Sequence, residues 1–381
     1  MPPQEKSELD HELNEPLLGV ALSAEASTGS AASPSPPGGE CIDGGDGRCD
    51  VEGGVHPDAT NETPFSVRKE LAEIGSLAAP LAVSFFCRMG MASTDSAFVG
   101  HIRDDSGRGA GMYLAAAVLA DMCVSILITP SLAFNQVLNA LVGQAMGSEN
   151  PKMAGVWLQQ SMFWLTVTML PCLVGFFYVE PALLILGFPQ DLARLAGTYA
   201  KYNVFWPVPN GLYQCMRFYF QAQGLPRPAM YNNIAFLFIN ALLNYVFVFG
   251  GPFRHIAAAG NWRGLGFVGA AVSLSISRTA QPVAYFLYMF AHKKHHRPTW
   301  PGISLVHHTR ARTIEFLLQS VPNVGTLLFQ VCSGQVNTIL VGRLGARAIA
   351  ASSAISTITL PIAGTLGATT GTVTAVRVGY H

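Results

Sequence analysis

The chain has few charged residues. Asp, Glu, Lys and Arg make up 12% of its 381 residues, about half of the ~25% found in a typical soluble domain. Hydrophobic residues make up 50%. This composition predicts a protein that lies in a lipid bilayer, which is therefore its first expected partner.

Other features are also missing. The formal net charge is +0 at pH 7, so no basic field favours nucleic acid as a partner. The seven cysteines show neither zinc-site spacing nor a disulfide framework. The sequence motifs of zinc proteases, serine hydrolases and nucleotide-binding loops are absent. We therefore expect no enzyme, no resident metal and no cofactor.

Residues 1–66 are rich in Ser, Gly, Pro, Asp and Glu and lack a sustained apolar run. Such a segment buries too little surface to offset its chain entropy, so we expect a disordered tail. Eight apolar segments follow, each interpreted as a membrane helix of about 20 residues or more. They are Leu71 to Val99, Leu114 to Val142, Val156 to Val179, Leu192 to Phe220, Ala229 to Phe249, Leu265 to Phe290, Ile314 to Val341 and Ala348 to Val376. The fold class is thus an all-α membrane protein.

The strongest basic cluster lies between the sixth and seventh segments. It comprises residues 293–297 together with Arg310 and Arg312. Positively charged loops stay in the cytosol, so this loop and, by parity, the N-terminal tail are expected there. The predicted organisation is a cytosolic tail over 1–66, a six-helix unit over 67–292, a basic loop over 293–312 and a further helix pair over 313–381.

Two stretches of the chain resemble each other. Pro80 followed by a closing Val99-Gly100 pair is repeated as Pro322 followed by Val341-Gly342, with the same spacing. Only the first copy has an acid, Asp95. An acid within an apolar span is by default a proton or ion site, because desolvation penalises its charged form. The alternative is an acid at a helix end that faces outer water.

Other polar side chains lie within the apolar segments. Arg88 is on the same helical face as Asp95 and is a candidate partner for it or for Asp121, although such a pair can also be purely structural. Arg278 has no assigned role. Asn240 and Asn244 are four residues apart and share a helix face. They are candidate site residues or, equally, interhelical hydrogen-bonding groups. Gln330 and Gln335 project from the seventh segment on neighbouring faces.

The run from Gly264 to Gly269 matches G-x-G-x-x-G but opens an apolar segment with no preceding strand. We interpret its glycines as small residues for close helix packing. The histidines at 292, 295 and 296 are interpreted as part of a solvated basic collar rather than as metal ligands.

Five short motifs occur at residues 95–101, 141–147, 221–228, 240–245 and 374–379. Together they resemble the eukaryotic multidrug and toxic compound extrusion (MATE) family. The similarity covers about residues 68–381. It implies two six-helix lobes around a central cavity, of which this chain would have the complete first lobe and two helices of the second.

The resemblance also implies export of small organic compounds, xenobiotics or metabolites, by antiport against H⁺ or Na⁺ with alternating access. Asp95 would be the cation-coupling acid with Asn240 and Asn244 beside it, and Tyr245, Gln330 and Gln335 would line the substrate route. The location would be the plasma membrane or the vacuolar membrane. The oligomeric state is not assigned.

The sequence departs from the family pattern in three places. Asn244 stands where members often have an acid, Gln330 and Gln335 stand where animal and plant members have glutamates, and the chain ends at His381, before the four further helices that the pattern predicts. Coupling is therefore expected to depend mainly on Asp95. Two alternatives are a lipid-linked oligosaccharide flippase of the wider superfamily, which Arg88 and Arg278 favour, and a non-transporting truncated form. A seven-helix receptor is disfavoured by the even helix count.

Overall fold

The computed structural model describes residues 67–102, 110–252, 262, 264–302, 309–345 and 347–356. The chain divides into two units, Met1–Ala72 and Glu73–His381. Only the start of helix α3 is described in the first unit, and all the other described helices belong to the second. The predicted tail over 1–66 lies outside the described residues.

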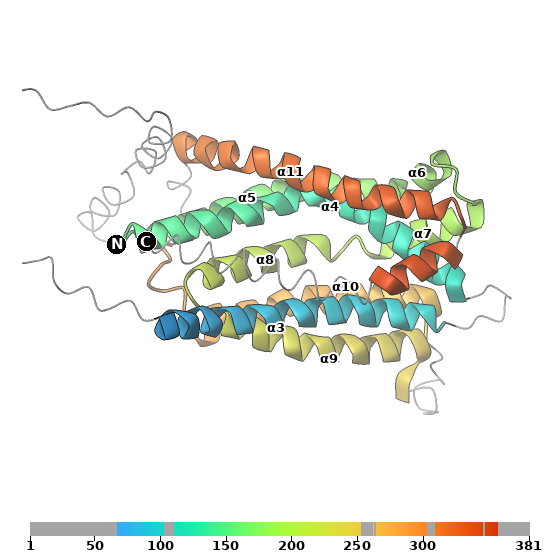
Figure 1. The fold of residues 1–381 in the computed structure, drawn as a ribbon, viewed down its shortest axis with the longest axis horizontal. Coiled ribbons are helices and arrows are strands. Elements are labelled where there is room, and N and C mark those ends of the chain that lie inside the picture. Colours follow the sequence, from blue (N-terminus) through green and yellow to red (C-terminus); the bar gives the residue numbers. More distant parts are fainter. Residues whose placement is uncertain are drawn as a thin grey trace, which may run out of the picture. The chain divides into compact units, whose positions relative to one another are not determined.

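Every regular element in the described ranges is a helix, which confirms the all-α prediction (Figure 1). The elements are α3 (Val67–Gly100), α4 (Ala110–Gly147), α5 (Pro151–Gly175), η1 (Phe176–Tyr178), α6 (Val179–Ile185), α7 (Gln190–Tyr202), α8 (Pro207–Ala222), α9 (Arg227–Phe249), α10 (Gly266–Phe286), η4 (Leu287–His292) and α11 (Arg310–Gly342). Residues 347–356 are also helical. They begin the eighth predicted segment, the rest of which lies outside the described residues.

One segment differs from the prediction. The sequence predicts a single helix from Leu192 to Phe220, but α7 ends at Tyr202 and α8 begins at Pro207. A proline has no backbone N–H to bond the carbonyl four residues earlier. Pro207 and Pro209 therefore remove two bonds that a continuous helix would need across residues 203–206.

Five helices in the described part are long and apolar enough to cross a bilayer. They are Ile74–Gly100, Gly111–Gly147, Pro151–Ile185, Arg227–Phe249 and Arg310–Gly342. Helix α10 has a spanning length of 21 residues, but its buried face carries the polar residues Ser273, Ser275, Ser277 and Gln281. Polar groups on a membrane helix are expected to face protein or a cavity rather than lipid.

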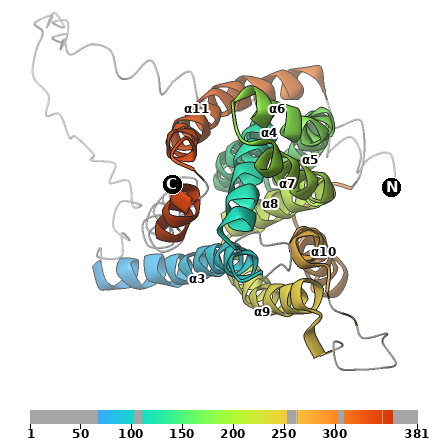
Figure 2. The same ribbon diagram turned by 90° about the vertical axis from the view of Figure 1, so that its right-hand side faces the viewer.

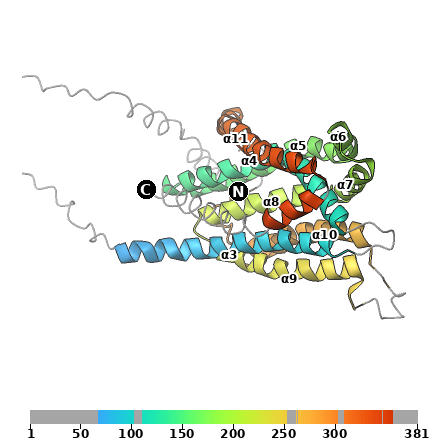
Figure 3. The ribbon, with the colours of Figure 1, turned by 45° about the vertical axis from the view of Figure 1, so that its right-hand side comes forward.

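Helix α4 lies at the centre of the packing and contacts α5, α7, α8 and α11. Its small residues Ala115, Ala116 and Ala120 are fully buried, and small side chains let neighbouring helices approach closely. Helix α9 lies beside α3 and α10 in two views (Figures 1 and 2). Helix α8 contacts both α4 and α10 and runs between them (Figure 3). This arrangement places α3, α4, α8, α9 and α10 around one region.

The glycines at the start of α10 serve packing, as the sequence predicts. Gly264 has a φ of +80°, and a Cβ there would lie 2.5 Å from the carbonyl oxygen of Val248. A Cβ on Gly269 would overlap the backbone carbonyl of Phe247 in α9. The absence of side chains at these positions therefore allows α9 and α10 to lie in direct backbone contact.

We expect Gly269→Ala to destabilise the protein by about 1–3 kcal/mol, because a backbone carbonyl cannot rotate away from the added methyl group. Thermal unfolding in detergent measures this loss. Gly325→Ala in α11 is the matched control, because a Cβ there meets nothing within 4 Å. Equal effects of the two substitutions would contradict the close packing of α9 and α10.

The first part of the loop after η4 is held against the helix bundle. Gln159 of α5 donates a hydrogen bond to the carbonyl of Gly302 at 2.8 Å. Tyr219 of α8 and Thr299 are joined through their hydroxyl groups. These contacts tie the loop to the start of α5 and the end of α8.

His296 in this loop makes stability depend on pH. Its ring stacks on Phe290 at 4.7 Å between centroids and meets the edge of Trp300 at 6.1 Å. Burial, followed by the cations Arg297 and Lys294, lowers the pKa of His296. The folded state thus prefers the neutral ring. The contribution of His296 to the stability of the fold is therefore complete above the unfolded pKa of about 6.5, and it falls as the pH drops below that value.

We therefore expect His296→Phe, which keeps the ring stack but cannot take up a proton, to gain thermal stability over the unsubstituted chain as the pH falls from about 8 to about 5.5. Melting curves across this range measure the difference. A difference between the two proteins that does not change with pH would contradict the role of His296. The surface substitution His292→Phe is the control.

Candidate functional site

Asp95 of α3 is bound by two amides of α9. Its Oδ1 accepts a hydrogen bond from Nδ2 of Asn240 at 2.7 Å and another from Nδ2 of Asn244 at 2.7 Å. Both asparagines are fully buried, and Asp95 is half-buried. The structure thus brings together the three residues that the sequence singles out as the cation site.

The spacing of the asparagines explains this geometry. Residues four apart lie on one face of a helix, and that face of α9 meets α3. The same face carries Asn233, whose Nδ2 donates a hydrogen bond to the carbonyl of Ser84 at 3.5 Å. Asn240 also donates to the carbonyl of Met91 at 3.5 Å. The side-chain amides of α9 therefore connect this helix to α3. Two of them also bind the ionisable side chain of Asp95.

The site has unused hydrogen-bonding capacity. The side-chain oxygens of Asn240 and Asn244 are buried and have no hydrogen-bond partner among the described residues. An unsatisfied buried oxygen is costly and is therefore informative. These two oxygens could accept a proton donor, or could bind a cation after the amides turn over.

Asp95 lies on the wall of a cavity of about 350 Å³. The cavity is formed by α3, α4, α7, α8 and α10 and by the connection before α8, and its lining is part apolar and part polar. Besides Asp95, its charged lining residues are Arg88, Asp121 and Arg278. A concave, mixed surface of this size suits a small organic molecule.

The candidate charge pair is not formed directly. Within the described part of the chain, no ion pair joins Arg88 to Asp121, although both line the same cavity. The guanidinium of Arg88 instead lies 3.5 Å from Oε1 of Gln214. Asp121 is exposed on α4.

The three predicted substrate-lining residues have different positions. Gln335 of α11 donates a hydrogen bond to the hydroxyl of Ser125 at 3.2 Å, and Ser125 lines the cavity. Gln330 is exposed. Tyr245 is 47% exposed and is not among the residues of the cavity wall. Of the three, only Gln335 is bonded to a residue of the cavity wall.

Sequence reasoning missed the contribution of α8. Trp206, Asn210 and Gln214 follow one another at intervals of four residues and all line the cavity. Arg217, one turn further on, is bonded to Gln214 at 2.6 Å and 3.0 Å. The spacing of four residues between these side chains could have indicated a shared helix face. It was overlooked because the segment was interpreted as one long apolar helix.

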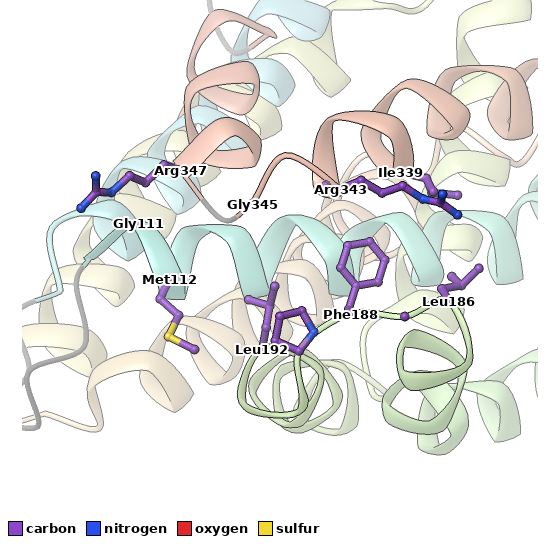
Figure 4. Close-up of a pocket in the computed structure, with 12 residues that line it drawn as sticks. Gly111, Met112, Leu186, Phe188, Leu192, Ile339, Arg343, Gly345 and Arg347 are labelled. Carbon is purple, nitrogen blue, oxygen red and sulfur yellow. The ribbon is translucent and has the colours of Figure 1, made fainter.

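A second hollow, of about 740 Å³, lies between α4, α11 and the connection from α6 to α7 (Figure 4). Met112, Phe188 and Leu192 lie along it in this view, and the side chains of Arg343 and Arg347 lie towards opposite ends. Among the described residues, its wall has neither an acid nor an amide side chain. These described residues therefore supply no group for proton or cation exchange. No group of three or more His, Cys, Asp or Glu residues with metal-binding spacing occurs in the part of the chain that the structure describes.

Comparison with known proteins connects this site to a family. The MatE family model matches residues 80–246, which include Asp95, Asn240 and Asn244. The chain belongs to the MATE family. It is 30% identical to the zebrafish (Danio rerio) multidrug and toxin extrusion protein 1 over 66% of this chain and 40% of the relative, and 28% identical to the human protein of the same name over 80% and 51%.

The fold agrees with this assignment. A crystal structure of the eukaryotic MATE transporter AtDTX14 matches with a TM-score of 0.66 and 21% identity, covering 82% of this chain and 66% of that one. The chain is thus a multi-pass integral membrane protein of eukaryotic MATE type. At the level of the family, the prediction that it is not an enzyme is supported. The chain spans about half the length of the curated relatives it matches.

Proposed function

We propose that this MATE chain takes part in the export of small organic compounds by antiport against H⁺ or Na⁺, with Asp95 binding the driving cation. The observation that carries the proposal is the pair of 2.7 Å hydrogen bonds from two buried amides to one carboxylate oxygen. This carboxylate lies beside a cavity of about 350 Å³. The printed names of the relatives, which describe multidrug and toxin extrusion, support the same activity.

The hydrogen bonds indicate how a bound proton would change the site. Ionised Asp95 accepts from both amides, and such charge-assisted bonds hold α3 against α9. Protonation removes the charge and turns the acid into a donor. Asn240 or Asn244 then turns its unpartnered oxygen toward the new O–H group. Proton exchange would thus rearrange the contact between the two helices, on the wall of the cavity where the substrate binds.

The arrangement favours H⁺ over Na⁺. Sodium and other hard cations prefer several oxygen ligands, whereas the two amides present nitrogen atoms to Asp95. No second carboxylate is bonded to this group within the described residues. Coupling by a proton requires only one acid, and Asp95 supplies it.

The alternative of a lipid-linked oligosaccharide flippase has one point in its favour, the presence of Arg88 and Arg278 on the cavity wall. A volume of about 350 Å³ in the described helices is at the low end of small-molecule sites, which fits a small organic molecule better than a sugar chain. Export of a small organic molecule is therefore the better proposal.

The test is transport by the full chain in proteoliposomes that contain a fluorescent organic compound. An imposed pH gradient should drive efflux, and collapse of the gradient with a protonophore should stop it. Efflux is measured in parallel with a Na⁺ gradient imposed at constant pH. Efflux that is equal with and without both gradients would contradict antiport, and no efflux at all would favour the non-transporting form.

The proposed topology is a cytosolic N-terminus in the plasma membrane or the vacuolar membrane. Lys293, Lys294 and Arg297 are exposed at the end of the six-helix unit, and basic loops remain in the cytosol. Protease digestion of sealed cells and of opened membranes distinguishes the two orientations of this loop.

A further inference from the structure

The cavity has a second polar cluster, which the cation site does not use. Gln214 of α8 presents one oxygen, Oε1, to two arginines. Arg217 donates to it from Nε at 3.0 Å and from Nη2 at 2.6 Å. Arg88 of α3 lies 3.5 Å away through Nη1. Two guanidinium groups thus share one neutral acceptor.

These arginines have no acidic partner. Among the described residues, neither Arg88 nor Arg217 forms an ion pair within 4.0 Å. Two further cations, Arg217 and Arg278, lie close enough to act on Arg88. Arg217 is only 8% exposed. Like charges repel strongly where water is excluded, so two guanidinium groups without an ion-pair partner give this part of the cavity a positive character.

The acids of the cavity lie with a different cation. Asp95 and Asp121 have Arg278 as their nearby positive group, and Asp95 is held by the amides of α9. Within the described residues, neither acid forms an ion pair with Arg88 within 4.0 Å. The cavity therefore has a mixed end around Arg278 and a positive end around Arg88.

The cavity wall also has hydrogen-bond donors that lack acceptors in the described chain. A guanidinium has five N–H groups, and Arg88 uses one of them in its contact with Gln214. The indole N–H of Trp206 is buried without a partner in the described chain. Arg88, Trp206 and Gln214 all line the cavity. Such a site requires a ligand group that only accepts hydrogen bonds.

We propose that the Arg88 end of the cavity is a subsite for the anionic group of the substrate, a carboxylate on a small organic molecule. Arg88 binds the carboxylate directly. Arg217 does not contact the carboxylate, but its positive charge attracts it and its hydrogen bonds hold Gln214 in place. The remainder of the molecule lies against apolar wall residues such as Val99, Leu114 and Ile128. This inference rests on the proposed export function and gives it a substrate class, organic anions and zwitterions rather than simple organic cations.

Binding to the purified full chain, measured by calorimetry without any gradient, tests the subsite. The probes are 4-phenylbutyrate, cinnamate and 1-naphthoate, each paired with its methyl ester and with the corresponding primary amine. Since a charge-assisted hydrogen bond contributes about 1.5–3 kcal/mol, at least one carboxylate should bind about 10- to 100-fold more tightly than its ester and its amine. No preference for any carboxylate, including no binding at all, overturns the proposal.

Two substitutions at Arg88 test whether this residue causes the carboxylate preference. Arg88→Gln should abolish the preference, and Arg88→Glu should reverse it in favour of the amines, a gain that a misfolded protein cannot show. Arg227→Gln, at an exposed arginine at the start of α9, should retain the preference of the unsubstituted chain. A carboxylate preference that survives Arg88→Glu places the anion elsewhere and overturns the assignment.

The result can be separated from that of the proposed function. A carboxylate preference without gradient-driven efflux would leave the subsite intact and contradict antiport. Gradient-driven efflux of the amines without any carboxylate preference would contradict the subsite and leave antiport intact.

Discussion

Asp95→Asn is expected to abolish cation-driven transport while leaving the fold intact. The asparagine side chain has the same shape, and its oxygen can still accept the hydrogen bonds from Asn240 and Asn244. It can neither lose nor gain a proton in the working pH range. The coupling between cation and substrate, typically about 1–3 kcal/mol or a factor of about 5–150 in affinity, should therefore disappear.

The measurement is efflux at a fixed substrate concentration with the pH gradient present and absent. The ratio of the two rates should fall to one in Asp95→Asn, with substrate binding and melting temperature retained. Asp191→Asn, at an exposed acid in the first turn of α7, is the matched control and should keep the full ratio. An Asp95→Asn protein that couples normally would remove Asp95 from the mechanism.

Asn244→Asp is expected to convert the site into a much better Na⁺ site. The substitution replaces an N–H donor 2.7 Å from Asp95 by a second carboxylate. Two carboxylates at this distance cannot both remain charged and unpaired. They will share a proton or bind a cation between them, and the unpartnered oxygen of Asn240 is available as a third ligand.

Thermal unfolding in NaCl and in choline chloride, at equal ionic strength, measures this change. At a Na⁺ concentration about 100 times the dissociation constant, binding should stabilise the variant by about 2.7 kcal/mol. The unsubstituted chain should respond much less, because its amides present nitrogen to Asp95. Asn323→Asp, at an exposed asparagine of α11, controls for the added charge. Equal responses of Asn244→Asp and the unsubstituted chain would contradict the assignment of the site.

The clustering of Asp95 with Asn240 and Asn244 was predictable because it depends on periodicity. Asn240 and Asn244 must share a face of any helix that contains them, and a single acid in an apolar segment attracts polar partners. The same rule explains why Tyr245 lies elsewhere. Adjacent residues point about 100° apart on a helix, so a buried Asn244 turns Tyr245 away from that face.

The α8 cluster was not predictable in the same way. A hydropathy pattern gives a continuous apolar segment from Leu192 to Phe220, and it does not register that Pro207 and Pro209 interrupt the hydrogen bonding. Once the helix is taken as continuous, Gln214 and Arg217 have no defined relation to Arg88, which lies far away in the sequence. Contacts of this kind depend on how two helices pack, and the spacing within either helix does not specify that.

The interruption between α7 and α8 has a consequence for hydration. Helices of 13 and 16 residues extend about 20 Å and 24 Å, and each is shorter than the ~30 Å hydrocarbon layer. Their junction is irregular backbone, which a bilayer tolerates only where protein or a water-filled cavity satisfies its polar groups. Ser275 satisfies the carbonyl of Tyr202, and Trp206, at this junction, lines the cavity, so we expect water in the cavity to reach the rest of the junction. The backbone amides of residues 204–206 and 208 should consequently take up deuterium faster than those in the middle of α9.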